Sequence, residues 1–401
     1  MVTSSDVIVI GAGPGGAVAA GLLARGGLTV TLLDRSRFPR EKTCGDALTP
    51  RAVAVLSELG LLEGLRPEAF SIKRLEIIGP AGGSIDLPLK PPAGTTDACL
   101  VVRRRTLDEE IRRWAQAGGA RFVAPARVTR VDGDHDGVRV VGVLDDVPLT
   151  LTARAAVIAT GGDIGLLRRS NVLKQTPDVM LATRTYYEGS GPPTDRLQFR
   201  FDGLPMPSYG WLFPLHAGCW NVGALVYPTR RNKTTAGRAL ETFLAGPAMV
   251  GMLRDCRATR KPEGYPLRGD FETAPTGGPS MLLIGEAAGL VNPLTGEGID
   301  YALESASIAA KLLLPRLKDG RFSAETVTEY DALLRARYQR MFRFSRRTRE
   351  FAVRPALLDR LIGLARRRTE LAALLMEILQ GPRDAADSPG RAEILRLLAT
   401  G

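Results

Sequence analysis

The sequence predicts an α/β fold in which a domain of alternating strands and helices is interrupted by a β-sheet domain and followed by a helical region. Three observations support this prediction. A glycine-rich turn joins two short apolar strands within the first 34 residues, the stretch from about 175 to 270 is rich in strand patterns, and the chain is helical in pattern beyond Ser323. We expect the first domain at residues 1–172 and 276–316, the β-rich domain at 173–275 and the helical region at 317–401.

The first segment carries the strongest signal. A short apolar strand over Asp6–Ile10 leads into the turn Gly11-Ala12-Gly13-Pro14-Gly15-Gly16, and a helix of small residues follows through Arg25. A second strand over Leu28–Leu33 ends at the acidic residue Asp34. This order of strand, glycine-rich turn, helix, strand and acidic residue is typical of a Rossmann-type dinucleotide-binding unit.

Each glycine of this turn has a physical role. Gly11 permits the tight turn, Gly13 lets the backbone approach a pyrophosphate, and Gly16 lets the helix pack closely on the strand. The phosphates then meet free N–H groups at the helix N-terminus, and Asp34 is placed to accept hydrogen bonds from the adenosine ribose.

The next predicted elements are short strands and two helices. The residues from Val128 to Ala159 alternate between apolar and polar types around turn residues, which predicts a β-meander. The other elements that we expect are a helix over Arg51–Leu59, strands near Lys73–Ile78 and Leu100–Val102, and a helix over Arg104–Ala117.

The β-rich domain contains three aromatic residues at a spacing of two. In a strand, Tyr209, Trp211 and Phe213 project from one face, the chain turns at His216-Ala217-Gly218, and Cys219–Val226 returns as the paired strand. Such a row of rings is either core packing or the wall of a binding site.

A second glycine-rich segment follows a buried strand over Met281–Ile284. Glu286 at the strand end can accept hydrogen bonds from a sugar-like chain. The segment Pro293–Gly298 then leads into a helix that begins near Ile299, and Gly296 and Gly298 allow a flat ring to approach its N-terminus. The alternative is a glycine-rich helix entry with no ligand.

Charge and cysteine content narrow the class of protein. The chain has 54 basic and 43 acidic residues, a net charge of +11, which favours an anionic partner. The four cysteines are scattered and form no disulfide or metal pattern, and no apolar stretch of about 18 residues is present. We expect a cytoplasmic protein, either free or peripheral to a membrane, with no metal and no nucleic-acid partner.

Together, these motifs resemble FAD-dependent oxidoreductases of the p-hydroxybenzoate hydroxylase type, on the N-terminal turn, the stretch Arg104–Asp108 and the late G-E-A-A-G…P-x-x-G-E-G-I segment. Two further stretches are similar to the geranylgeranyl reductase family. Phe38–Leu48 matches F-P-R-x-K-x-C-G-D-x-L, and Tyr209–Pro214 matches Y-x-W-x-F-P. The resemblance covers roughly residues 5–310 and implies a Rossmann-type FAD-binding domain.

The resemblance also implies roles for individual residues. Cys44, Tyr209 and Trp211 would be catalytic, and the aromatic row with His216 would bind substrate. Two departures stand out, because the family usually has Asp at Glu286 and Asp-Gly at Gly161-Gly162. The residues expected to bind FAD are Gly11, Gly13, Gly16, Asp34, Arg35, Cys44, Gly45, Arg104, Gly162, Glu286, Gly296, Gly298 and Ile299.

The expected function is FAD-dependent reduction of carbon–carbon double bonds in an isoprenoid or polyprenyl substrate. Cys44 either protonates one alkene carbon, helped by the nearby cations Arg40 and Lys42, or is a small buried hydrophobic residue. The alternatives are a flavin-dependent monooxygenase, halogenase or dehydrogenase of a specialised metabolite, and a flavoprotein without turnover.

The electron donor and the partners follow from the same motifs. The sequence has no second nucleotide fingerprint, so NAD(P)H or another electron carrier would dock transiently. The substrate would be an apolar small molecule or lipid, with or without a diphosphate. The C-terminal arginines are either solvated or lie on an anionic membrane surface; they are Arg343, Arg346, Arg347, Arg349 and Arg366-Arg367-Arg368.

Overall fold

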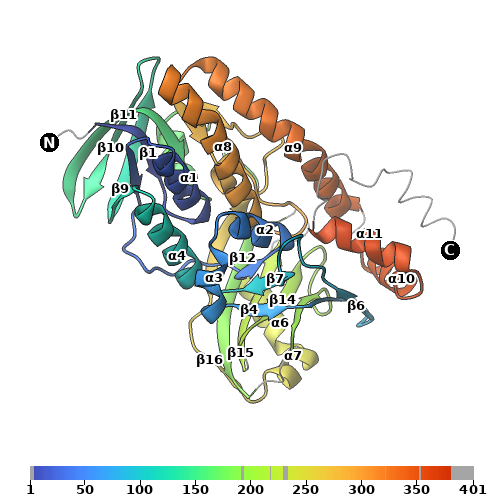
Figure 1. Ribbon diagram of the computed structural model, residues 1–401. Helices are drawn as coiled ribbons and strands as arrows, with labels where there is room; N and C mark the ends of the chain where they lie inside the picture. The colour runs from blue at the N-terminus through green and yellow to red at the C-terminus, as the bar shows by residue number, and fades with distance from the viewer. Residues whose placement is uncertain are drawn as a thin grey trace.

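The computed structural model describes residues 4–190, 194–216, 218–228, 234–320, 322–351 and 354–380, and it confirms the α/β fold with a C-terminal helical region (Figure 1). Two eight-stranded sheets lie on either side of the segments that connect them, and a third sheet has three strands. The predicted turn residue Ala217 and the last 21 residues of the expected helical region lie outside the described residues.

The first sheet has a parallel core in the strand order β19-β11-β1-β2-β8. Because the strands are parallel and in register, Ile10, Leu33 and Ile158 bring their carboxyl ends to one edge. The bounds are β1 Ser4–Ile10, β2 Val30–Leu33, β8 Arg121–Val123, β11 Val147–Ile158, β18 Gly277–Gly278 and β19 Met281–Leu283.

The apolar runs of β1 and β2 are buried almost throughout, as expected for strands of a parallel sheet that is covered on both faces. Helix α1 (Pro14–Arg25) packs against α4 (Arg104–Ala117) and α8 (Ile299–Asp319). The predicted meander is also confirmed, because β9 (Ala126–Gly133), β10 (Val138–Leu144) and β11 pair in antiparallel order.

The second sheet has the order β16-β12-β15-β14-β13-β5-β6, with β17 paired to β12. Its predicted aromatic hairpin is confirmed, since β14 and β15 pair with Trp211 opposite Gly223. The bounds are β5 Arg74–Ile78, β6 Ser84–Pro88, β12 Val179–Gly189, β13 Arg196–Arg200, β14 Tyr209–His216, β15 Cys219–Val226, β16 Cys256–Ala258 and β17 Glu263–Arg268.

This second sheet crosses the domain boundary that we expected at residue 173. Strand β5 pairs in parallel with β13, so a segment from the first hundred residues completes a sheet formed mainly by residues 179–268. Two short helices also lie within this region, α6 (Ala236–Ala245) and α7 (Pro247–Met252), where we expected mainly strands. Phe243 of α6 packs on the strand at Gly210, where even a Cβ atom would lie 2.5 Å from the ring.

A small sheet and two helices link the halves of the molecule. Strands β3 (Ala47–Leu48), β7 (Cys99–Val101) and β4 (Phe70–Ile72) pair in the order β3-β7-β4. The adjacent helices are α2 (Pro50–Glu58) and α3 (Leu62–Leu65), and Thr49 caps α2 by accepting a hydrogen bond from the Ala52 N–H.

The C-terminal helices extend across both halves (Figure 1). Helix α9 (Ala324–Phe351) buries Tyr330, Tyr338 and Phe342 against Tyr301 and Phe271, with edge-on ring contacts of 5.1–6.4 Å among the last four. Helices α10 (Pro355–Ala365) and α11 (Thr369–Gln380) cover an apolar cluster of β5 and β6 that includes Ile77, Ile85 and Leu87. Among the described residues, no helix combines the length and hydropathy needed to cross a membrane.

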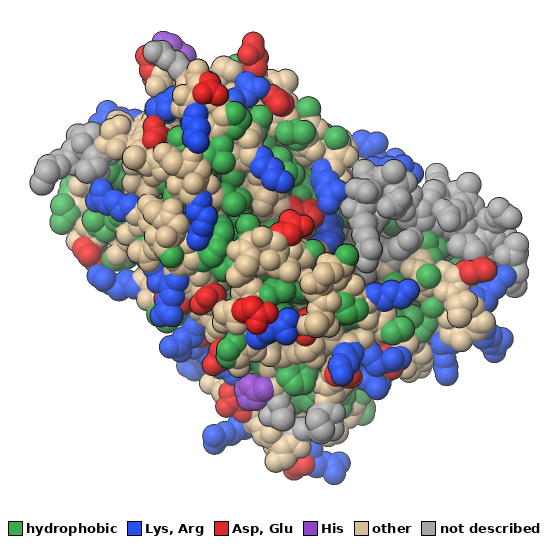
Figure 2. All heavy atoms as spheres, viewed as in Figure 1, with side chains coloured by type: hydrophobic (Ala, Val, Ile, Leu, Met, Phe, Trp, Pro, Cys, Tyr) green, Lys and Arg blue, Asp and Glu red, His purple; other side chains and the backbone are tan. Residues whose placement is uncertain are grey.

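On the face of the molecule shown in Figure 2, the described Lys and Arg side chains are distributed and not gathered in one patch. Figure 2 shows Lys and Arg side chains scattered over the whole visible face, with Asp and Glu among them. In the C-terminal region, Arg343 and Arg346 pair with Glu272 at 3.5 and 2.7 Å. Arg349 donates a hydrogen bond to the Pro293 carbonyl at 3.2 Å, so these three arginines fasten α9 to the rest of the chain.

The glycine turn provides a test of the first domain. A Cβ atom on Gly16 would lie 1.8 Å from the Gly11 carbonyl oxygen, whereas one on Gly237, in an exposed helix, would contact nothing within 4 Å. We expect Gly16→Ala to lower the free energy of unfolding by about 2–4 kcal/mol, and Gly237→Ala to raise it by up to about 1 kcal/mol. Urea unfolding of the two variants measures both values, and equal effects would contradict the packing described.

Candidate active site

A cavity of about 600 Å³ lies between the carboxyl edge of the first sheet and the inner face of the second. Its polar part contains the glycine turn, Asp34 and Arg104. Its apolar part is formed by side chains of the second sheet and the segments beside it, including Leu75, Leu89, Leu197, Phe199 and Leu225. A charged ligand and an apolar ligand can therefore meet in one space.

The structure brings nearly all of the predicted site residues to this cavity. His216 is an exception, because it is exposed at the end of β14 and does not line the cavity. Gly162 lies just behind the lining and donates its N–H to the Tyr265 hydroxyl at 2.8 Å. Those on the lining are Gly11, Gly13, Gly16, Asp34, Arg35, Cys44, Gly45, Arg104, Tyr209, Trp211, Phe213, Glu286, Gly296, Gly298 and Ile299.

The polar part has the features of a phosphate site. A Cβ atom on Gly13 would face the cavity and come within 3.6 Å of Arg40 and 3.9 Å of Arg104, so two guanidinium groups converge where a pyrophosphate would approach. Asp34 is buried and its oxygens accept the N–H groups of Ala12 and Ser36, both at 2.8 Å. These bonds hold the carboxylate at the end of β2 and leave it further lone pairs.

Arg104 is held by Asp108 one turn later on α4. Two hydrogen bonds of 2.7 and 2.8 Å join the guanidinium to both carboxylate oxygens, and Arg40 lies 3.1 Å from the same carboxylate. Burial lowers the pKa of the Arg104 guanidinium, but the effects of Asp108 and Cys44 together outweigh burial and raise this pKa. The guanidinium therefore stays protonated at every physiological pH, and Asp108 balances its charge.

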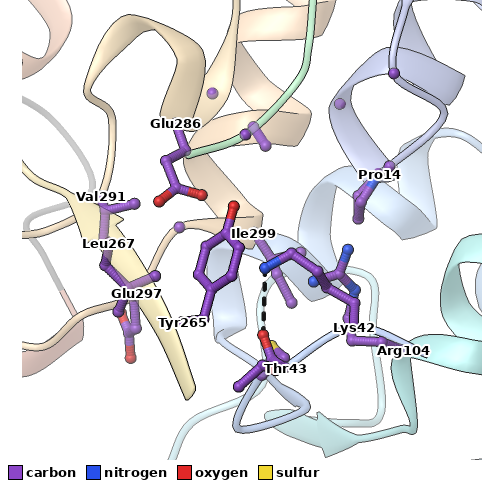
Figure 3. A pocket seen from close by; sticks show the side chains of 18 of the residues that line it. Pro14, Lys42, Thr43, Arg104, Tyr265, Leu267, Glu286, Val291, Glu297 and Ile299 are labelled. Atoms are coloured by element: carbon purple, nitrogen blue, oxygen red, sulfur yellow. Dashed lines mark hydrogen bonds between the residues drawn. The ribbon is translucent and has the colours of Figure 1, made fainter. Parts of the chain in front are cut away.

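Lys42, Tyr265 and Glu286 form a second polar group in the cavity (Figure 3). The Lys42 ammonium lies 2.9 Å from the centre of the Tyr265 ring, and Glu286 lies beyond the hydroxyl end of that ring. Burial lowers the pKa of Lys42 to about 7, although Glu286 acts in the opposite direction. Burial likewise raises the pKa of Glu286, against the effect of Lys42.

This group explains the two departures from the family pattern. A Cβ atom on Gly161, where the family has Asp, would lie 3.3 Å from a Glu286 oxygen and 3.3 Å from the Tyr265 hydroxyl. Gly161 also adopts φ +63, a conformation that side chains disfavour. The longer side chain at 286 therefore fills space that an Asp side chain at 161 would crowd, and the two departures compensate each other.

Tyr209, Trp211 and Phe213 form a continuous row of rings on the cavity side of β14. Ring centres lie 6.4 Å apart for Tyr209 and Trp211 and 6.2 Å apart for Trp211 and Phe213, and Phe199 adds a fourth ring 5.2 Å from Phe213. The Tyr209 hydroxyl donates to the Thr295 carbonyl, and the Trp211 indole N–H donates to Asn221 at 2.9 Å. Both polar hydrogens therefore already have protein acceptors. This arrangement suits rings that line the cavity and does not suit donation of a proton to a bound molecule.

The loop Pro293–Gly298 closes another side of the cavity. The hydroxyls of Tyr209 and Tyr227 donate to its carbonyls at Thr295 and Leu294, and Arg349 reaches it from α9. Gly296 has φ +74, and a Cβ atom there would lie 3.1 Å from Leu225. The second sheet and the C-terminal helices thus hold this loop in place.

Cys44 lies between the two parts of the cavity. It is half-buried, its sulfur accepts the Asp46 N–H at 3.4 Å, and the Arg104 guanidinium is near enough for an electrostatic interaction with the sulfur. Gly45 beside it packs against the aromatic row, since a Cβ atom on this glycine would lie 3.1 Å from the Phe213 ring. Cys99 and Cys219 are buried, and Cys256 is half-buried outside the cavity lining.

Comparison with known proteins identifies the family. The family model of the FAD binding domain matches residues 4–177. A menaquinone reductase of Mycolicibacterium smegmatis is 32% identical over 94% of this chain and 92% of its own. The chain belongs to the geranylgeranyl reductase family of FAD-dependent oxidoreductases. Within the family, digeranylgeranylglycerophospholipid reductase 1 of Methanopyrus kandleri is 28% identical over 86% of this chain and 90% of its own.

Solved structures agree on the fold. A geranylgeranyl bacteriochlorophyll reductase-like protein from Thermoplasma acidophilum superposes with a TM-score of 0.83 at 20% identity, covering 99% of this chain and all of that one. A flavin-dependent brominase gives 0.79 at 19% identity, covering 99% and 98%. Identities this low show a shared fold and leave the reaction to be argued from the residues.

The residues present fit FAD, the cofactor of this family. The bare backbone at Gly13, the two converging guanidinium groups and the carboxylate at the end of β2 match a pyrophosphate and a ribose. Sequence analysis missed the Tyr265 contact and the buried pair Asp46 and Asn221. Asp46 stands within the quoted motif, two residues after Cys44, but no local pattern showed that Asn221 contacts Asp46 or that Tyr265 contacts Lys42.

Lys42 provides a test of the electrostatics. In the FAD-free protein its pKa is about 7, whereas the unfolded chain has the ordinary value of 10.5, so the unfolded chain binds the extra proton between these values. The free energy of unfolding must therefore rise with pH in this window. We expect Lys42→Met to remove about 1–2 kcal/mol of the rise between pH 7 and pH 9.

Urea unfolding of the FAD-free protein at both pH values measures this effect. Loss of the Lys42 cation also removes an effect that lowers the pKa of Glu286. The higher pKa of Glu286 further reduces the rise of the unfolding free energy with pH. The exposed residue Lys73 supplies the matched control, and Lys73→Met should keep the wild-type pH dependence. An unchanged pH dependence in Lys42→Met would show that the ammonium is solvated.

Proposed function

We propose that this chain reduces carbon–carbon double bonds in the isoprenoid part of an apolar lipid, such as the tail of a lipoquinone. The observation that carries the proposal is the single cavity in which Cys44 lies between the glycine turn and the aromatic row. A cofactor held at the polar part and an alkene held at the apolar part would meet beside a thiol.

The relatives support the substrate class. Proteins that match almost all of this chain are named menaquinone reductase, and others are named digeranylgeranylglycerophospholipid reductase. Both names refer to isoprenoid lipids with several double bonds. The apolar side chains of the cavity suit such a chain, because they offer contact area and no hydrogen-bonding groups for a polar substrate.

In the proposed reaction, FAD supplies a hydride when it is bound and reduced, and the chain's own residues supply the proton and the geometry. The Cys44 S–H bond would break as its proton passes to one alkene carbon, and the other carbon would take up the hydride that the reduced cofactor supplies. The thiolate that remains is stabilised by the Asp46 N–H and by Arg104, and solvent then returns its proton. The product has two more hydrogens per bond reduced, and the two electrons come from the cofactor.

The other residues orient and enclose the substrate in this proposal. Gly13, Asp34, Arg40 and Arg104 would hold the adenosine diphosphate part of FAD, and the loop Pro293–Gly298 would border its ring. The row of Tyr209, Trp211 and Phe213 would pack along the isoprenoid chain, a role that suits rings whose polar hydrogens already have acceptors. His216 has no part in it, because its side chain is exposed outside the cavity.

The electron donor and a lipid surface complete the proposal. NAD(P)H or another carrier would dock transiently to reduce the cofactor. The exposed arginines Arg360, Arg366 and Arg367 flank the apolar helices α10 and α11, an arrangement that favours contact with an anionic membrane from which a lipid enters.

An anaerobic turnover experiment tests the proposed function. The purified protein with FAD is reduced with dithionite without oxygen and mixed with menaquinone in detergent. We expect the flavin absorbance to return without oxygen. After the extracted lipid is reoxidised in air, which returns any quinol to the quinone, mass spectrometry should still show two added hydrogens per reduced bond in the isoprenoid tail. A reaction that needs oxygen, or a product that gains oxygen or halogen, would instead support the monooxygenase or halogenase alternative.

Replacement of Cys44 tests the proton donor. Cys44→Ser should lower kcat for alkene reduction about 100-fold, because a hydroxyl is a far weaker acid than a thiol, while FAD binding is retained. Single-turnover rates and the bound FAD content measure the two effects. Cys256→Ser, at a half-buried cysteine outside the cavity, is the control, and equal rates in both variants would return Cys44 to a packing role.

A further inference from the structure

The segment that carries Cys44 is fastened to the second sheet by a series of hydrogen bonds. Arg184 of β12 donates to the Lys42 carbonyl at 3.1 Å, and Asn221 of β15 donates to the Cys44 carbonyl at 2.8 Å. The Asp46 carboxylate accepts from the Tyr186 hydroxyl at 2.7 Å and from Asn221 at 2.8 Å. The thiol is therefore positioned by the second sheet, which also carries the aromatic row. In the chain, however, the segment with Cys44 comes directly after β2 of the first sheet.

Asn221 is the branch point of these contacts. Its amide nitrogen donates to both the Cys44 carbonyl and the Asp46 carboxylate, and its amide oxygen accepts the Trp211 indole N–H at 2.9 Å. The side chain is fully buried, so no solvent competes for these bonds. One amide thus links the thiol segment, a buried carboxylate and the central ring of the aromatic row.

Asp46 connects this network to the sulfur itself. It has φ +65, a conformation that Asp and Asn tolerate better than other side chains, and its N–H points to the Cys44 sulfur at 3.4 Å. Its carboxylate is fully buried and also accepts the Arg104 N–H at 3.3 Å. These bonds hold the strained backbone in the orientation that directs the N–H at the thiol.

We propose that Asn221 and Asp46 are positioning residues that hold the Cys44 thiol at a set place relative to the Trp211 ring. The inference rests on the proposed function, in which the thiol protonates an alkene packed along that ring. Proton transfer to carbon needs the acid within reach of one particular atom, so a small displacement of the thiol reduces the rate far more than it reduces lipid binding.

An exchange of the two side chains separates positioning from stability. In Asn221→Asp two carboxylates face each other, so that contact is lost. In Asp46→Asn the amide oxygen can still accept from Asn221 and Tyr186, but the amide nitrogen then faces the Arg104 backbone N–H, which loses its acceptor. In the double variant Asp46→Asn/Asn221→Asp, the amide at 46 donates to the carboxylate at 221, which also accepts from Trp211. The donor to the Cys44 carbonyl is missing, and the Tyr186 hydroxyl loses the carboxylate oxygen that it shared with Asn221.

We expect each single variant to lower the Tm by about 5 °C and the double variant to recover part of this loss. The double variant should nevertheless keep a kcat about 10-fold below wild type, with KM for menaquinone within about twofold and full FAD content.

Iodoacetamide should alkylate Cys44 of the double variant about fivefold faster than Cys44 of wild type, because the segment that carries it is no longer held. Cys256 is the internal reference.

Thr276→Val is the matched control. It removes one partly buried hydrogen bond, from the Thr276 hydroxyl to Asp331 at 2.8 Å, at a place outside the cavity lining. We expect it to lower the Tm without a change in kcat or in Cys44 alkylation. Trp211→Phe gives a milder version of the test. It removes the N–H that orients the Asn221 amide, together with one ring of the indole, and Cys44 alkylation should rise about twofold.

Three results would overturn the proposal. They are a kcat in the double variant that recovers together with Tm, a Cys44 alkylation rate equal to wild type in the double variant or in Trp211→Phe, and a wild-type kcat in both single variants. If wild-type protein does not reduce menaquinone at all, the proposed function fails, and the alkylation rates still decide whether Asn221 and Asp46 position the thiol.

Discussion

The cavity depends on hydrogen bonds that tie two loops of the nucleotide-binding half to the second sheet. One loop carries Cys44 and is held by Arg184, Asn221 and Tyr186. The other is Pro293–Gly298, held by Tyr209 and Tyr227. Because both loops are anchored to the same sheet, the cofactor side and the substrate side of the cavity keep a fixed separation, which a reaction between two bound molecules requires.

The parts of the cavity differ in how their charged groups are paired. Arg104 is neutralised within its own helix by Asp108, so it contributes hydrogen-bond donors without an unpaired buried charge. Lys42 has no carboxylate in hydrogen-bond contact among the described residues, lies against the Tyr265 ring, and has a pKa of about 7. The apolar side chains beyond Cys44 then exclude water from the region where an alkene would lie.

The departures from the family pattern are physically linked. Glu286 is longer than the usual Asp, and the space for it exists because position 161 has no side chain, since a Cβ atom there would lie 3.3 Å from a Glu286 oxygen. The Tyr265 hydroxyl beside it accepts the Gly162 N–H. A chain that altered only one of these positions would leave a clash or a gap. The Gly161-Gly162 sequence therefore preserves the cavity in a different form and does not signal its loss.

The sequence by itself determined the unit β1-α1-β2 of the nucleotide-binding half, since its two strands, helix and turn glycines are neighbours in the chain and follow local patterns. The bounds of α4 and β15 and the meander were predicted for the same reason. The tertiary structure alone decided that β5 completes the second sheet, that Tyr265 meets Lys42, and that Asn221 holds Cys44, 177 residues away. These contacts depend on how distant segments pack, and periodicity within one segment carries no information about its partners.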